Sequence, residues 1–232
     1  MTQDDLKAAV GRAAAALVED GMAIGLGTGS TTAHALREIG ARIATEGLRV
    51  TGVPTSFAAE RLARACGIPL TTLDETPVLD LALDGADEVD GALDVVKGRG
   101  GAMTRERIVA AAARRFVVLV DAGKRVERLG STMPVPVEVV PMAAAPLTRA
   151  LAELGARAVV REGGGKDGPV VTDQGLWILD AHIGGGGLGD AAAFAAAVKA
   201  LPGVLDHGLF IGLATTVLVA DGGGVTRIDR PA

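Results

Sequence analysis

The chain has 232 residues, enough for one compact domain with a smaller second one. Lys and Arg number 23 against 28 Asp and Glu, a formal charge of -5 at pH 7, which argues against a nucleic-acid partner. Hydrophobic residues make up 49% and charged residues 22%, proportions typical of a globular chain and not of a disordered one. Glycine is over-represented, with 33 residues clustered between apolar runs, so many turns are expected to bring backbone close to another group.

The compartment follows from cysteine usage and from the absence of targeting patterns. The single cysteine, Cys66, cannot form an internal disulfide, so we expect a reducing compartment, the cytoplasm. The start of the chain, residues 1–5, is acidic, so no signal peptide is expected. The most apolar run, residues 208–220, is shorter than the about 20 residues of a membrane helix, so no membrane partner is expected.

The first 125 residues alternate helical and strand patterns. Apolar residues at helical spacing after a capping-box-like Thr2 and Asp5 predict a helix, and the run 22–26 predicts a buried strand. The elements expected next are helix 30–44, strand 48–53, helix 56–66, strands 79–83 and 93–96, helix 104–114 and strand 116–120. Their strands are continuously apolar, which predicts an open, Rossmann-like α/β domain with a mostly parallel sheet covered on both faces.

After residue 130 the rhythm changes to strand 135–140, helix 144–154, strands 157–161 and 176–181, helix 190–201 and strand 204–210. This order predicts a small ferredoxin-like α+β domain over 131–211. The apolar run 214–220 and the end of the chain are expected to rejoin the first sheet, so that the Rossmann-like catalytic domain comprises 1–130 plus 212–232. We interpret the glycine runs 163–168 and 184–187 as flexible hairpin or connector loops.

A first candidate for chemistry is the glycine-rich segment 25–32, GLGTGSTT, between a predicted strand and a predicted helix. Glycines let backbone amides approach an anion, the helix amino terminus adds its dipole, and Thr28, Ser30 and Thr31 add hydroxyl donors. Neither the GxGxxG dinucleotide pattern nor the Walker pattern is complete, so a phosphorylated small molecule fits better than NAD or ATP. A tight turn without a ligand remains an alternative.

Four further segments carry polar residues next to predicted strands or at a helix start. They are 84–88 with two aspartates, 97–101 with a lysine among glycines, 104–106 with Glu106, and 121–124 with Lys124. Each has a plain structural alternative, since Asp and Gly are ordinary turn residues, a carboxylate stabilises a helix start, and a lysine is often only solvated. Because the carboxyl ends of parallel strands share one edge of a sheet, we expect these segments to converge there.

The sequence shows no residue pattern for metal-dependent or nucleophilic catalysis. His34, His182 and His207 are dispersed, no metal-ligand spacing is present, and nothing suggests a Ser-His-Asp triad. We therefore expect no metal and no cofactor. An anionic substrate beside carboxylates and a lysine suits proton transfer on a sugar phosphate.

The strings GLGTGSTT, LDGADEVD, VKGRGGAMTRERI, VDAGKRVERLG and PVPVEVVPMA, in this order, closely resemble the type A ribose-5-phosphate isomerases. The resemblance covers nearly the whole chain. It implies interconversion of D-ribose 5-phosphate and D-ribulose 5-phosphate through an enediol or enediolate, in the non-oxidative pentose phosphate pathway. It also implies a homodimer or homotetramer.

Carried over position by position, the resemblance implies that Glu106 is the general base and that Asp84, Lys97 and Asp87 are the other catalytic residues. The substrate-binding residues that it implies are Thr28, Gly29, Ser30, Thr31, Asp84, Gly85, Ala86, Asp87, Lys97, Gly98, Arg99, Gly100, Lys124 and Lys7. The family often has KGGG where this chain has KGRG, so Arg99 departs from the pattern. A positive φ at Arg99 would strain the backbone, whereas an exposed Arg99 would change nothing.

Two other functional classes stay open on the residues alone. A sugar-phosphate sensor would keep the glycine loop but would normally carry a helix-turn-helix, for which no room exists before residue 22. A deaminase of amino-sugar phosphates or a coenzyme A transferase would need other catalytic residues and would not explain Lys97 together with Glu106. Formation of a ketose from ribose 5-phosphate separates these alternatives.

Overall fold

The structure, a computed structural model, describes residues 2–165 and 167–231 and divides into two compact units. The first unit comprises Met1–Ala86, Arg105–Lys124 and Gly212–Ala232, and the second comprises Asp87–Thr104 and Arg125–Ile211. Residues 87–104 and 125–130 thus group with the second unit, although the sequence assigns them to the first domain. The reason is that β4 (Glu88–Val89) and β5 (Val95–Val96) form a three-stranded sheet with β11 (Leu209–Phe210).

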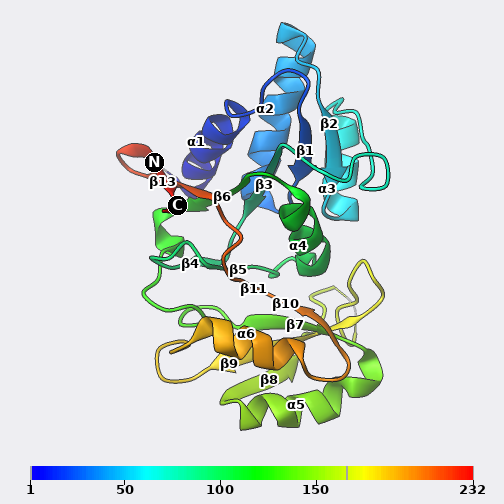
Figure 1. Ribbon diagram of the computed structural model, residues 1–232, viewed down its shortest axis with the longest axis vertical. Helices are drawn as coiled ribbons and strands as arrows, with labels where there is room; N and C mark the ends of the chain where they lie inside the picture. Colours follow the sequence, from blue (N-terminus) through cyan, green and yellow to red (C-terminus); the bar gives the residue numbers. More distant parts are fainter. Residues whose placement is uncertain (1, 166, 232) are drawn as a thin grey trace. The chain divides into compact units, whose positions relative to one another are not determined.

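The first unit is built on a six-stranded sheet with the order β13-β12-β6-β3-β1-β2 (Figure 1). Its strands are β1 (Ala23–Leu26), β2 (Thr51–Pro54), β3 (Leu81–Gly85), β6 (Phe116–Asp121), β12 (Thr216–Asp221) and β13 (Gly224–Asp229). All neighbours pair in parallel except β12 and β13, which are antiparallel. The chain reverses direction across the sheet between β1 and β3, and such switch points are where open α/β sheets bind ligands.

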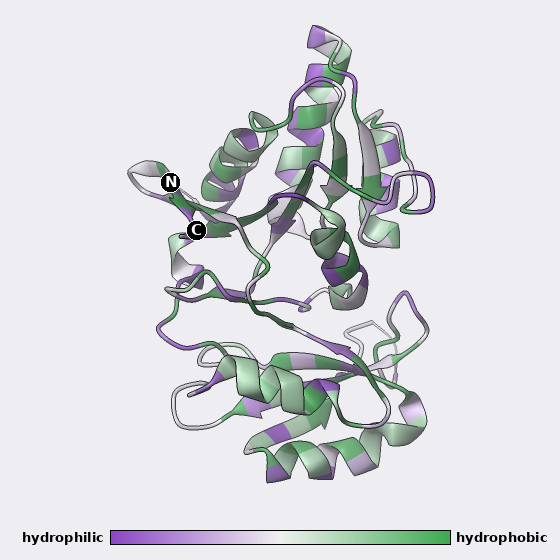
Figure 2. Cartoon of the chain, in the orientation of Figure 1, coloured by the Kyte–Doolittle hydropathy of each residue, from purple (hydrophilic) through white to green (hydrophobic). Residues whose placement is uncertain are grey.

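Helices cover both faces of this sheet because its strands are apolar on both sides. The helices are α1 (Gln3–Ala15), α2 (Ser30–Glu46), α3 (Phe57–Ala65) and α4 (Met103–Ala112), with the short η1 (Ala122–Lys124) after β6. Ile24 and Leu26 of β1 belong to the buried cluster that includes α1 and α2. Gly25 faces the other way, where a Cβ would lie 2.4 Å from Val109 Cγ1 of α4. In Figure 2, green hydrophobic stretches lie along strands of this sheet, as expected of a sheet covered on both faces.

The second unit has the predicted βαββαβ order. Besides β4, β5 and β11, its elements are β7 (Val135–Val139), η2 (Pro141–Ala143), α5 (Ala144–Glu153), β8 (Ala156–Val160), β9 (Trp177–Ile183), α6 (Ala191–Lys199) and β10 (Val204–His207). The sheet order is β10-β7-β9-β8 and every pairing is antiparallel, which is the ferredoxin-like arrangement. The predicted fold class, a mostly parallel α/β sheet with a smaller α+β unit, is therefore confirmed.

Local predictions also compare well with the structure. The capping box at Thr2 and Asp5 is present. The predicted strand 204–210 is interrupted, because Gly208 lies against the Lys97 carbonyl and separates β10 from β11. In the glycine run 163–168, Gly163 N donates to Gly168 O at 3.1 Å, as in a hairpin, while residue 166 lies outside the described residues. No helix in the described ranges is both long and apolar enough to cross a membrane.

Candidate functional site

The glycine-rich segment lies at the carboxyl edge of the first unit's sheet, as predicted. Strand β1 ends at Leu26, and α2 begins at Ser30 with Gly29 as its N-cap at φ 112°. Among the residues that the structure describes, no side chain caps this helix start, and its first turn holds no acidic residue. Its amino-terminal amides and the hydroxyls of Ser30 and Thr31 therefore suit an anion such as a phosphate.

Asp84 joins this segment to β3. The side chain is 2% exposed, and its Oδ1 accepts hydrogen bonds from Thr28 N at 3.1 Å, Gly85 N at 2.7 Å and Thr32 Oγ1 at 3.4 Å. A Cβ at position 27 would lie 2.4 Å from the Asp84 carboxyl group, so only glycine allows this close approach. The carboxylate and the glycine-rich segment are thus held in one fixed arrangement.

Thr55 and Ser56, which sequence reasoning missed, complete the polar edge. The Thr28 hydroxyl lies 2.8 Å from Thr55 Oγ1 and donates to Ser56 Oγ at 2.7 Å. Both partners are buried, and Ser56 also caps α3 through Ala59 N. The available signal was a Thr-Ser pair directly after a parallel strand, at the same edge as Thr28. These hydroxyls fix the orientation of Thr28.

Glu106 lies in the first turn of α4 and is 6% exposed. The carboxyl end of α4 lies at the start of β3, because Leu79 N donates to Ala112 O at 2.9 Å. The helix therefore runs from the carboxyl edge of the sheet to its amino edge. Glu106 precedes Val109, which packs against Gly25, by about 4.5 Å along the helix axis. This places Glu106 towards the end of β1, where the glycine-rich segment begins.

Two lysines of the predicted set belong to the same unit. Lys124 ends η1, which follows β6, the strand next to β3, and it is half-buried. Lys7 is half-buried on α1, one turn after Asp4, whose Oδ1 lies 3.2 Å from His34 Nε2 of α2. Lys7 therefore lies on the side of α1 near the amino-terminal part of α2.

The remaining predicted residues cluster in the second unit. Lys97 follows β5 and is 3% exposed, with its Nζ 5.7 Å from the centre of the Phe210 ring. Its backbone N donates to Gly208 O at 2.8 Å. Arg99 N donates to Asp87 Oδ2 at 3.0 Å, so the turn 97–100 and Asp87 are in direct contact.

The departure from the family pattern at Arg99 leaves the backbone relaxed. Gly98 has φ 101°, but among the described non-glycine residues only Leu93 has a positive φ. Arg99 is exposed. The glycine of this turn that cannot be replaced is therefore Gly98, where a Cβ would lie 2.4 Å from Met103 Sδ.

Glu88, which follows Asp87, was not predicted to matter. It is fully buried and accepts four hydrogen bonds, from Gly130 N at 2.5 Å, Thr132 N and Thr132 Oγ1 at 2.6 Å each, and Met133 N at 2.8 Å. These bonds attach loop 130–133 to β4. The role of Glu88 is therefore to hold the segment that begins with Asp87.

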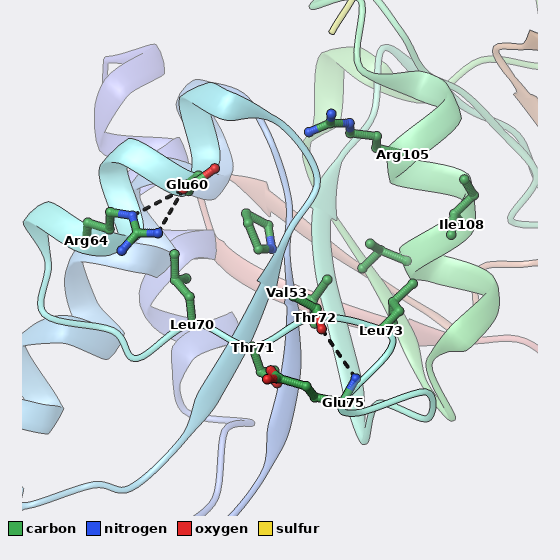
Figure 3. A pocket seen from close by; sticks show the side chains of 12 residues that line it. Val53, Glu60, Arg64, Leu70, Thr71, Thr72, Leu73, Glu75, Arg105 and Ile108 are labelled. Carbon is green, nitrogen blue, oxygen red and sulfur yellow. Dashed lines mark hydrogen bonds and ion pairs between the residues drawn. The ribbon is translucent and has the colours of Figure 1, made fainter. Parts of the chain in front are cut away.

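A separate groove of about 480 Å³ lies in the first unit between β2, α3, loop 70–75 and α4 (Figure 3). Apolar and polar side chains line it in equal number, and the polar ones include the Glu60–Arg64 ion pair and Arg105. Arg105 stacks 4.6 Å from the centre of the Phe57 ring. Its lining includes none of the predicted site residues, so it is distinct from the polar edge described above.

The structure thus brings the predicted residues together as two groups. Glu106, Asp84, Lys124, Lys7 and residues 28–31, 85 and 86 belong to the first unit, and Asp87 and residues 97–100 belong to the second. A parallel sheet whose carboxyl edge gathers hydroxyls, buried carboxylates and a helix start that no described side chain caps is the arrangement of an α/β enzyme that acts on a small anionic metabolite.

Comparison with known proteins identifies the family. The family model of ribose 5-phosphate isomerase A (phosphoriboisomerase A) matches residues 51–224. A ribose-5-phosphate isomerase A of Roseiflexus castenholzii is 54% identical over 216 residues, which cover 92% of this chain and 91% of the relative. The chain belongs to the ribose 5-phosphate isomerase A family, and it is an isomerase.

Solved structures agree over the full length. The ribose 5-phosphate isomerase A of Methanocaldococcus jannaschii superimposes with a TM-score of 0.94 at 46% identity, covering 98% of this chain and 100% of that chain. A D-ribose-5-phosphate isomerase in complex with phospho-erythronic acid gives a TM-score of 0.96 at 40% identity, with 99% and 100% coverage.

Proposed function

We propose that Glu106 is the base with which this chain interconverts D-ribose 5-phosphate and D-ribulose 5-phosphate. The observation that carries the proposal is the position of a buried glutamate in the first turn of α4, one turn before Val109, which lies against Gly25 near the carboxyl end of β1. Phospho-erythronic acid, bound in a structural relative, is an acyclic phosphorylated sugar acid. A substrate of that kind needs an anion site at one end and acid–base groups at the other.

In the proposed reaction, the Glu106 carboxylate removes the proton from C2 of the open-chain aldose. The electron pair of the broken C–H bond forms the C1–C2 double bond, and the C1 carbonyl oxygen becomes an oxyanion. A proton then moves from O2 to O1, and Glu106 returns its proton to C1, leaving the ketone at C2. A positioned base of this kind contributes about 10² to 10⁴ in rate.

The other residues of the proposal have distinct roles. Lys97 supplies a positive charge for the oxyanion and, with Asp84, passes the proton between the two oxygens. Asp87 contacts sugar hydroxyls and assists ring opening. Residues 28–31, with Lys7, bind the phosphate, and this binding energy orients the reacting carbons. Lys124 makes a further substrate contact.

Location and assembly are part of the same proposal. A single cysteine, half-buried at position 66, suits a reducing cytoplasm. We place the enzyme there as a homodimer or homotetramer, and light scattering of the purified protein measures the assembly directly.

The experiment that tests the proposed reaction follows ketose formation from ribose 5-phosphate, with ribose as the matched substrate lacking the phosphate. We expect ribose to react with a lower kcat as well as a higher KM, because phosphate binding is expressed partly in the transition state. Equal kcat values for the two substrates would contradict the assigned phosphate site. Absence of ketose from ribose 5-phosphate would contradict the function.

A further inference from the structure

We propose that Arg161 is a positioning residue for the reaction, because its guanidinium group sets the conformation of the turn that carries Lys97. This inference rests on the proposed role of Lys97. Arg161 directly follows β8, and its side chain is 15% exposed. Arg161 belongs neither to the proposed phosphate site nor to the proposed base.

The contacts of Arg161 use the geometry that only a guanidinium provides. Nε and Nη2 donate to the two carboxylate oxygens of Asp180, at 2.9 and 2.5 Å. Nη1 donates to two consecutive backbone carbonyls, Gly98 O at 2.8 Å and Arg99 O at 2.9 Å. A lysine offers one compact charge and cannot hold both a carboxylate and two carbonyls in one plane.

The turn that receives these bonds has one internal hydrogen bond, from Gly101 N to Gly98 O at 3.0 Å, and Arg161 adds two more at its carbonyls. Two successive carbonyl oxygens point to the same cation, an arrangement in which their dipoles repel unless a positive group lies between them. Gly98 has φ 101°, a conformation that glycine adopts readily. Glycine adopts other conformations equally readily, so contacts from other residues must select this one. On the Asp87 side, the Arg99 amide is held by the carboxylate. Arg161 and Asp87 therefore fix the turn through its carbonyls and its amide respectively.

The burial of the pair supports a positioning role. Asp180 is 18% exposed, and a largely buried ion pair of this kind is often no more stabilising than apolar residues of the same size. Arg161, Asp180, Asp87 and Arg99 also line one cavity of about 300 Å³ in the second unit. The Arg161–Asp180 pair is thus placed where it can determine the positions of the Lys97 and Asp87 side chains.

The test compares R161M, R161K and R161A with R149M, a control that removes the exposed Arg149–Glu153 pair of the same unit. We expect kcat to fall about 10- to 100-fold in all three Arg161 variants, since a full displacement of about 1 Å at a reacting group costs about 100-fold and a partial one costs less. KM should change less, and R149M should match the wild type. Millimolar ethylguanidinium should raise the kcat of R161A with saturation, and should leave K97A unaffected.

Hydrogen exchange of the segment 97–103, measured by mass spectrometry, separates this inference from the role of Lys97. Faster exchange there in R161M, with a lower kcat, supports the proposal. Wild-type kcat in R161M overturns it, and K97A then shows which part fails. An impaired K97A means that Arg161 is dispensable for placing Lys97, whereas an active K97A means that Lys97 itself has no catalytic role. A loss in R161A that ethylguanidinium does not reverse also overturns the proposal.

Discussion

Replacement of Gly27 by alanine tests whether the close approach of the glycine-rich segment to Asp84 matters for activity. The added Cβ would lie 2.4 Å from Asp84 Cγ, Asp84 Oδ1 and Leu83 O. Ordinary van der Waals contact begins at 3.4 Å, so the carboxyl group or the segment must move by about 1 Å. Strand pairing through Gly27 N and Leu83 O, at 2.9 Å, opposes that movement.

We expect two effects of this displacement. Forcing an extra methyl group into a tightly packed site costs about 1–3 kcal/mol of unfolding free energy. A displacement of about 1 Å at a catalytic carboxylate lowers kcat about 100-fold. Urea unfolding measures the first effect, and initial rates with saturating ribose 5-phosphate measure the second.

Gly47 provides the matched control. It ends α2 at φ 71°, and no described atom lies within 4 Å of the Cβ that alanine would add, so G47A is strained by about 1–2 kcal/mol without touching the site. Both variants should lose stability, and only G27A should lose kcat. A G27A enzyme with a kcat within a few-fold of that of G47A would refute the argument that this contact aligns Asp84.

Three further predictions concern other parts of the chain. E88Q should lower the unfolding free energy by about 1–3 kcal/mol, since the amide group of glutamine cannot accept all four hydrogen bonds from loop 130–133. An unchanged urea midpoint would show that these bonds do not contribute to stability. Burial raises the pKa of the Cys66 thiol above its ordinary 9.0, so alkylation by iodoacetamide at about pH 8 should be slower in the native protein than in urea-unfolded protein, and equal rates would contradict this. The hydrogen bonds from Arg49 hold the pKa of Asp20 below its ordinary 3.8, so the stability that this pair contributes is present above pH 3.8 and is lost as the pH falls through the lower folded pKa. D20N should therefore lose less stability than the wild type between pH about 5 and 2, and identical acid melting curves of the two proteins would contradict this.

Sequence patterns were sufficient for the fold because they are local. Continuously apolar strands predicted the parallel sheet, and the order of elements after residue 130 predicted the ferredoxin-like unit. The segments 25–32, 84–88 and 121–124 were predicted as candidate site segments in the same way, since strand ends of a parallel sheet share one edge. The predicted role of Glu106 as general base required the family resemblance, because a carboxylate in a first helical turn is more often only a favourable charge.

What the sequence did not predict depends on long-range contacts. Arg161 contacts the turn at Gly98 across 63 residues, and Glu88 contacts Thr132 across 44. The assignment of residues 87–104 to the second unit depends on pairing between β5 and β11, which are more than 100 residues apart. No periodicity in one segment carries information about such partners.

The central claim is that Glu106 carries the proton between C2 and C1, and E106Q in D₂O tests it most directly. Proton NMR of ribose 5-phosphate measures loss of the C2 hydrogen to solvent and ketose formation together, while equilibrium dialysis measures substrate binding. We expect both reactions to fall at least about 100-fold in E106Q, with substrate binding largely retained. Exchange of the C2 hydrogen by E106Q at close to the wild-type rate would contradict it, because another group would then have to remove that proton.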